Sequence, residues 1–87
     1  MVRMFARHQV ADYDAWRKVY DGFERESLGV RQHAVYRSID DPNDVTVWHD
    51  FDDRDSAASF VGSAELKSTM QRAGVVSEPN IWITEEA

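Results

Sequence analysis

The feature that most restricts the fold of this chain is a single strongly amphipathic helical stretch that follows a segment without helical periodicity. From Tyr13 to Phe23, apolar and aromatic side chains recur at spacings of three and four residues, and charged side chains fill the positions between them. Asp12 precedes this stretch and can accept hydrogen bonds from the free amides of a helix start. Because residues 2–9 show no helical stripe, the sequence predicts a strand followed by a helix.

A β-hairpin is predicted after this helix. Residues 30–39 and residues 45–51 are rich in the β-branched and aromatic side chains that favour strands. The segment between them, residues 40–44, contains Pro42 and Asn43 among three aspartates, a composition that favours a tight turn. We therefore expect the two strands to pair antiparallel.

The last third of the chain predicts a second helical region and a fourth strand. Helical spacing of apolar residues resumes near Asp53, and a slip between two apolar stripes predicts a break at Gly62–Ser63. Gly74 is expected to end this region. Residues 80–85 alternate isoleucine with tryptophan and threonine, which is typical of a strand with two different faces.

The order of these elements defines a fold class. The succession β-α-β-β-α-β is the ferredoxin-like arrangement, an α+β fold in which a four-stranded antiparallel sheet carries its helices on one face. The chain has 87 residues and contains no repeat, linker or low-complexity tract. We therefore expect a single domain spanning residues 1–87.

The composition argues against several classes of protein. Without cysteine, the chain has no thiolate nucleophile and no thiolate metal site. Sixteen acidic and ten basic residues give a formal net charge of −6, which repels nucleic acid and anionic lipid surfaces. The three histidines fall on three different predicted strands, which disfavours a metal site. We expect a cytoplasmic protein that binds neither nucleic acid nor membrane.

One face of the predicted sheet has no helix to cover it. Pairing Ile39 with Asp44 across the turn assigns each hairpin side chain to a face. The face toward the helices then receives Ala34, Tyr36, Val45, Val47, His49 and Phe51. The open face receives His33, Val35, Arg37, Thr46, Trp48 and Asp50. An open, partly apolar face favours a homodimer in which two such faces enclose a cavity and bury about 800 Å² per subunit.

Two residues of this open face are candidates for catalysis. In the predicted register His33 and Asp50 lie opposite each other, so that the carboxylate could orient the imidazole for proton transfer. The alternative is a cross-strand charge pair at a solvated edge of the sheet.

Further residues are candidates for ligand binding. Trp48, Val35 and Trp82 could form the wall of a pocket for a planar apolar molecule, with Arg37 as its charged group, or they could fill the dimer interface. His8 could line the mouth of the cavity or satisfy nearby backbone groups. By contrast, His49 is expected to be a core histidine with one hydrogen-bond partner.

Three segments resemble those of a known family. The stretches HQVADYDAW (residues 8–16), YRSIDDPN (36–43) and MQRAGV (70–75) are similar to those of small bacterial members of the dimeric α/β-barrel superfamily, which includes the antibiotic biosynthesis monooxygenases. The resemblance implies a ferredoxin-like subunit that dimerises through its open sheet face to form a dimeric α/β barrel. Some members of the superfamily use the cavity for cofactor-free oxidation, ring closure or haem breakdown, and the resemblance implies a comparable cavity here. No haem site is predicted for this chain.

Two functions of different classes follow. The first is a homodimeric domain that binds a small aromatic or apolar ligand in the cavity between the sheet and its partner. The alternative is a cofactor-independent monooxygenase or cyclase that acts on an aromatic, polyketide-type substrate. Neither hypothesis requires a bound cofactor.

Overall fold

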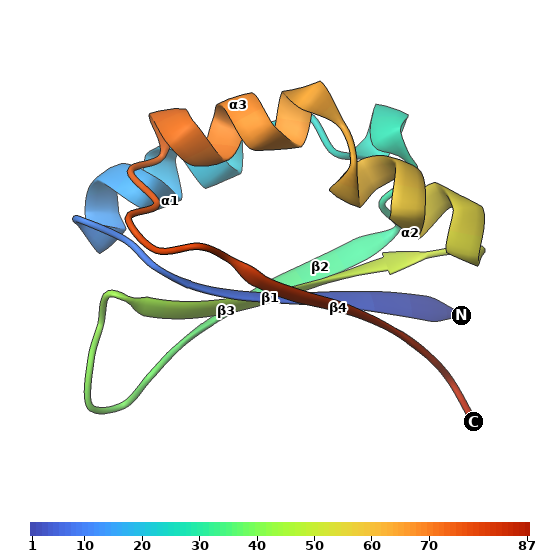
Figure 1. Ribbon diagram of the computed structural model, residues 1–87, viewed down its shortest axis with the longest axis horizontal. Coiled ribbons are helices and arrows are strands. Elements are labelled where there is room, and N and C mark those ends of the chain that lie inside the picture. The colour runs from blue at the N-terminus through green and yellow to red at the C-terminus, as the bar shows by residue number, and fades with distance from the viewer.

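The computed structural model describes residues 1–87 and places helices over one face of a four-stranded antiparallel sheet (Figure 1). The strands are β1 (Val2–Gln9), β2 (Gln32–Arg37), β3 (Asp44–Phe51) and β4 (Asn80–Glu85), in the spatial order β2-β3-β1-β4. The helices are α1 (Tyr13–Gly22), α2 (Arg54–Val61) and α3 (Ala64–Arg72), and a short 3-10 turn, η1 (Glu26–Leu28), follows α1. The predicted ferredoxin-like α+β class is confirmed. None of the helices has the length and apolar character needed to cross a bilayer.

The predicted helix boundaries are largely confirmed by their caps. The side chain of Asp12 accepts a hydrogen bond from the Asp14 amide at the start of α1, as expected of an N-cap. The predicted break in the second helical region separates α2 from α3, and the Ser63 hydroxyl caps α3 by accepting from the Leu66 amide. Gly74 follows α3 with a φ of 79°, the left-handed conformation that glycine adopts without strain.

The first helix is shorter than its polar pattern suggests. It ends at Gly22, and the Phe23 amide bonds back to the Tyr20 carbonyl. The chain then passes through η1 and turns at Gly29, whose φ is 90°. Arg25 therefore lies in the connection after the helix, and only 8% of its surface is exposed.

The core lies between the helices and the inward face of the two central strands. Even-numbered side chains of β1 and odd-numbered side chains of β3 point toward the helices and are buried: Val2, Met4, Ala6, His8, Val45, Val47, His49 and Phe51. The ring of Phe51, which is fully buried, packs against Phe60 of α2 with 5.3 Å between ring centroids. These contacts fix which side of the sheet the helices cover.

The predicted register of the hairpin is wrong by one residue. Arg37 pairs with Val45, and the Ser38 amide donates to the Asp44 carbonyl, so the loop is longer than the four residues expected. The cause is the tight turn at Asp41, whose carbonyl accepts from the Asp44 amide and whose side chain accepts from the Asn43 amide. A one-residue slip moves every side chain of a strand to the other face, so all the predicted faces of β2 are exchanged.

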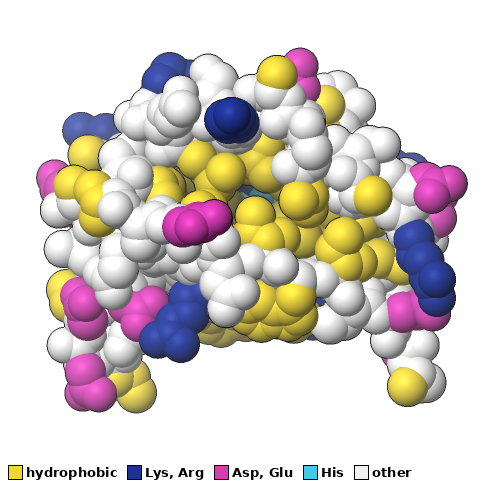
Figure 2. All heavy atoms as spheres, in the orientation of Figure 1, with side chains coloured by type: hydrophobic (Ala, Val, Ile, Leu, Met, Phe, Trp, Pro, Cys, Tyr) yellow, Lys and Arg dark blue, Asp and Glu magenta, His cyan; other side chains and the backbone are white.

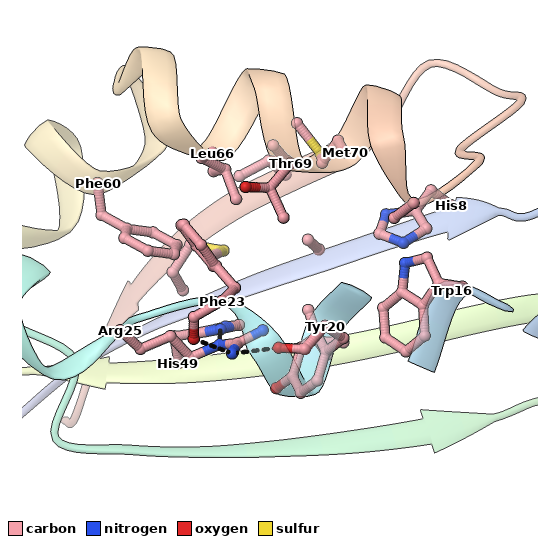
Figure 3. Close-up of a pocket in the computed structure, with 15 residues that line it drawn as sticks. His8, Trp16, Tyr20, Phe23, Arg25, His49, Phe60, Leu66, Thr69 and Met70 are labelled. Atoms are coloured by element: carbon pink, nitrogen blue, oxygen red, sulfur yellow. Dashed lines mark hydrogen bonds between the residues drawn. The ribbon is translucent and has the colours of Figure 1, made fainter. Parts of the chain in front are cut away.

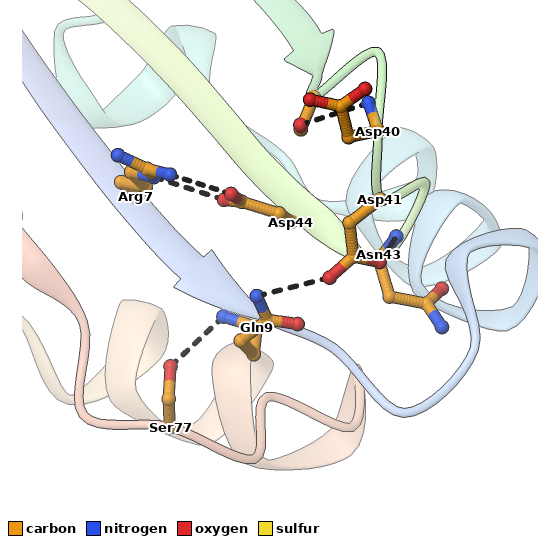
Figure 4. A network of polar contacts seen from close by, with 8 residues as sticks. Arg7, Gln9, Asp40, Asp41, Asn43, Asp44 and Ser77 are labelled. Carbon is orange, nitrogen blue, oxygen red and sulfur yellow. Dashed lines mark hydrogen bonds and ion pairs between the residues drawn. The ribbon is translucent and has the colours of Figure 1, made fainter.

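Polar contacts hold this loop against the end of β1 (Figure 4). Gln9 donates from its side chain to Asp41 and from its backbone to the Ser77 hydroxyl. Asn43 accepts from the Tyr13 amide through its side chain. Beside them, Arg7 forms two hydrogen bonds with Asp44 across the strands. The acidic turn thereby connects the hairpin to the start of α1.

Candidate functional site

A pocket opens between the helices and the inward face of the sheet. Figure 2 shows hydrophobic side chains gathered in a hollow between the helices and the strands. The cavity has a volume of about 50 Å³, and eleven of its fifteen lining residues are hydrophobic. It therefore favours a small and predominantly apolar occupant.

The lining residues come from both layers of the fold. Trp16, Tyr20 and Phe23 belong to α1 and the turn after it, and their helical spacing had identified them only as core residues. The sheet contributes Met4, Ala6, His8, Val47, His49 and Ile81, while α2 and the segment containing α3 contribute Phe60, Leu66, Thr69, Met70 and Ala73. Leu66 and Met70 are only half-buried, so α3 forms the more accessible wall.

His8 is the polar group at one end of the pocket, beside Trp16 (Figure 3). Only 6% of its surface is exposed, and neither ring nitrogen has a hydrogen-bond partner in the chain. Burial lowers its pKa below the ordinary value, so the imidazole is neutral at pH 7. A neutral ring has one donor and one acceptor, and an occupant of the pocket reaches these buried nitrogens only when a neighbouring side chain moves.

Arg25 and His49 form a polar cluster at the other end. The Arg25 guanidinium donates through Nε to His49 Nε2, at 3.0 Å, and through Nη1 to the backbone carbonyls of Tyr20 and Phe23. It also stacks on the Tyr20 ring, 3.6 Å from the ring centroid. Burial and the neighbouring Arg25 charge lower the pKa of His49 to about 3, so this imidazole is also neutral. The prediction of a core histidine with one partner is confirmed for His49.

The two predicted catalytic residues do not face each other. His33 pairs with His49 on the helix side of the sheet, and its Nδ1 lies 2.7 Å from the Tyr20 hydroxyl. Asp50 lies on the open face, where it forms two hydrogen bonds with Arg3. The predicted pair is wrong because the register slip of β2 carries His33 to the opposite face.

The five predicted ligand-binding residues divide between the two faces. Trp48 and Trp82 lie on the open face. The Cζ atom of Arg3 lies 3.7 Å from the centroid of the Trp48 ring, and the Trp82 ring stacks on Phe5. The helix side holds the other three: Val35 packs against the core, Arg37 lies over the ring of Tyr13, and His8 lines the pocket. The expected wall of Val35, Trp48, Trp82 and Arg37 is not formed within one chain.

The sequence reasoning missed Arg25. Its position and charge fit the polar face of an amphipathic helix that continues past Phe23. The spacing of the apolar residues does not show that α1 ends at Gly22, before Arg25. The only local signal is Gly22, a residue that weakens helix interiors.

The buried histidines predict a loss of stability in mild acid. The unfolded chain binds a proton at His49 near pH 6.5, whereas the folded chain binds it only near pH 3. Between these values the unfolded state holds more protons, so the free energy of unfolding falls as the pH is lowered. The lowered pKa values of His8 and His33 act in the same direction.

Urea unfolding at pH 6.5 and 5.0 measures this effect. We expect the wild type to lose about 2 kcal/mol from His49 over this range, which lies above the titration of most carboxylates. The variant His49→Gln should lose distinctly less stability over the same range. An equal loss in both proteins would contradict a neutral, buried His49.

Comparisons with known proteins bear on the fold. No protein-family model and no curated protein matches this sequence. Among solved structures, an antibiotic biosynthesis monooxygenase-like protein from Bordetella bronchiseptica superimposes with a TM-score of 0.80 at 16% identity, covering 99% of this chain and 96% of the other. A conserved protein from Methanosarcina mazei Go1 superimposes with a TM-score of 0.77 at 19% identity, covering 99% of this chain and 92% of the other. SnoaB, a cofactor-independent oxygenase from Streptomyces nogalater, superimposes with a TM-score of 0.71 at 15% identity, covering 99% of this chain and 94% of the other. The chain thus has the fold of the antibiotic biosynthesis monooxygenase-like proteins.

Proposed function

We propose that this protein binds a small aromatic molecule in the pocket between its helices and its sheet. The observation that carries this proposal is the buried, unpartnered imidazole of His8 in a pocket otherwise lined mainly by apolar and aromatic side chains. A buried polar group without a partner costs about 1–3 kcal/mol, so a ligand that bonds to it gains a specific contact. An aromatic ring needs more room than the 50 Å³ of the cavity, since a dry cavity that binds benzene measures about 150 Å³. The half-buried Leu66 and Met70 on α3 must therefore move aside to admit it.

We also propose that the protein is a homodimer through its open sheet face. In Figure 1 the β2–β3 loop and the C-terminal residues extend on the side of the sheet away from the helices, where they can flank a second sheet. Trp82, with 42% of its surface exposed, and Tyr36, with 58%, leave apolar area on this side. The Arg3–Asp50 and Arg7–Asp44 pairs neutralise the charges of this face within each chain. A second copy can therefore approach despite the net charge of −6.

A second candidate function is cofactor-independent oxidation of the bound molecule. It is supported by the neutral His8, which can accept a proton from a substrate, and by the likeness in fold to SnoaB. In such a reaction the deprotonated substrate itself reduces dioxygen. The small cavity favours binding over this alternative, because a large polycyclic substrate requires α3 to move.

Binding is tested by titrating the isotope-labelled protein with phenol, which is neutral at pH 7, and following backbone amide shifts by NMR. We expect shifts concentrated at the pocket-lining residues and an affinity reduced about two- to tenfold in His8→Phe, since one neutral hydrogen bond is lost. Arg31→Gln, whose exposed side chain lies outside the pocket, is the control and should bind as the wild type does. Shifts confined to the open sheet face would contradict the proposed site.

Oxidation is tested by dioxygen uptake with anthrone, a tricyclic ketone whose methylene group ionises readily. If His8 is the proton acceptor, uptake should exceed the protein-free rate and fall at least about a hundredfold in His8→Phe. Uptake equal to the protein-free rate, or equal in the two proteins, would exclude this role.

Light scattering tests the dimer. We expect a mass near twice 10.0 kDa for the wild type. Trp82→Glu should shift the protein to the monomer, because each chain would bury an added charge without a partner in the interface. Val76→Glu, at an exposed position outside the strands, is the control and should remain dimeric. A monomeric wild type would exclude this interface.

A further inference from the structure

Arg25 is a buried cation without an anionic partner. The five salt bridges of the chain involve Arg3, Arg7, Arg17, Arg31 and Arg54, and every one of these guanidinium groups is far more exposed than that of Arg25. A buried charge is normally paired, because removal from water is costly. Arg25 thus differs from these five arginines, which are exposed and paired with a carboxylate, because it is buried and has no such partner.

The protein partners of Arg25 do not use all of its donors. Nε is bonded to His49, and Nη1 is bonded to the carbonyls of Tyr20 and Phe23 at the end of α1. Those carbonyls carry only the partial negative charge of a helix C-terminus. Nη2 makes no hydrogen bond within the chain, so one charged donor remains available beside the pocket.

His49 is held by Arg25 and keeps an unpaired donor on the other side of its ring. A guanidinium can only donate, so Nε2 of His49 accepts its bond and the ring proton lies on Nδ1. This Nδ1 is buried and has no partner in the chain. With 3% of its surface exposed, His49 is among the most deeply buried polar residues, and it lines the pocket.

The charge of the pocket has the sign opposite to that of the whole protein. Arg25 is the one charged residue among the fifteen that line the cavity, and no aspartate or glutamate is among them. The chain as a whole carries a formal charge of −6. The pocket therefore attracts an anion that the rest of the surface repels.

We propose that the pocket takes an aromatic monoanion, a ring bearing one ionised oxygen group, which is bound at the Arg25–His49 end. This inference rests on the proposed binding function and specifies its ligand class. The ionised oxygen accepts from Nη2 of Arg25, and the ring contacts the aromatic side chains between Arg25 and His8. His8 lies four positions along β1 from Met4, the partner of His49, which separates the two polar ends by roughly 13 Å along the strand. A second polar group on the far side of the ring can therefore reach toward His8.

Three probes of similar size and different charge test the inference in the wild type. Benzoate, benzamide and benzylammonium are titrated at pH 7 and constant ionic strength, with pocket amide shifts as the readout. We expect benzoate to bind at least about tenfold more tightly than benzamide, because hydrogen bonds to a charged group are the stronger ones, and benzylammonium to bind most weakly.

Variants assign the preference to Arg25. Arg25→Gln should abolish the difference between benzoate and benzamide, and Arg25→Lys should retain part of it by keeping the charge. Arg31→Gln removes an exposed arginine outside the pocket and should leave the ratio unchanged. If Arg25→Gln does not fold, the wild-type ratio and Arg25→Lys still decide the question.

The outcomes separate this inference from the function on which it rests. Equal binding of benzoate and benzamide in the pocket would overturn the anion preference and leave the binding function intact. Tighter binding of benzylammonium would also overturn it. If none of these probes and no neutral aromatic shifts the pocket amides, the binding function itself fails.

Discussion

The ladder between the two central strands is the constraint on which the rest of the structure depends. β1 and β3 pair over eight residues, from Val2 opposite Phe51 to Gln9 opposite Asp44. Because side chains alternate along a strand, this one register assigns both a buried face and an open face. The helices cover the face that carries Phe51, and the Arg3–Asp50 pair lies on the other. The pocket and the open face are therefore two sides of the same eight-residue ladder.

The elements that could be predicted from the sequence are those whose signals are local. Asp12 and Ser63 accept hydrogen bonds from helix amides a few residues away, and Gly74 adopts the left-handed conformation its position suggests. The alternation in β4 places Trp82 opposite Phe5 and both isoleucines on the other face, as the pattern predicts. Such features depend on the residue itself and its near neighbours, so a sequence pattern contains them.

The hairpin register depended on a turn whose geometry the composition does not determine. A set of turn-forming residues at positions 40–44 is compatible with more than one loop length. The side chain of Asp41 selects one of them by bonding to the Asn43 amide. That choice placed His33 beside Tyr20 rather than opposite Asp50, so the predicted catalytic pair was lost through a single residue of slip.

The candidate site was harder to predict than the fold because its polar residues come from places that periodicity does not describe. Arg25 enters the pocket only because α1 ends at Gly22, and His8 enters it as one buried member of an alternating strand. Both resemble ordinary members of their segments in the sequence. What distinguishes them is the absence of a partner in the folded chain: no carboxylate for the guanidinium and no hydrogen bond for the imidazole.

The shared ladder also couples the two faces of the molecule. His49 faces the pocket, and the next residue, Asp50, faces the open side, where Arg3 fixes it with two hydrogen bonds. Contacts that restrain Arg3 and Trp48 on the open face therefore restrain the backbone that positions His49 and Met4 beneath a ligand. A partner on the open face would therefore lie against the reverse side of the pocket floor and contribute no side chain to the pocket.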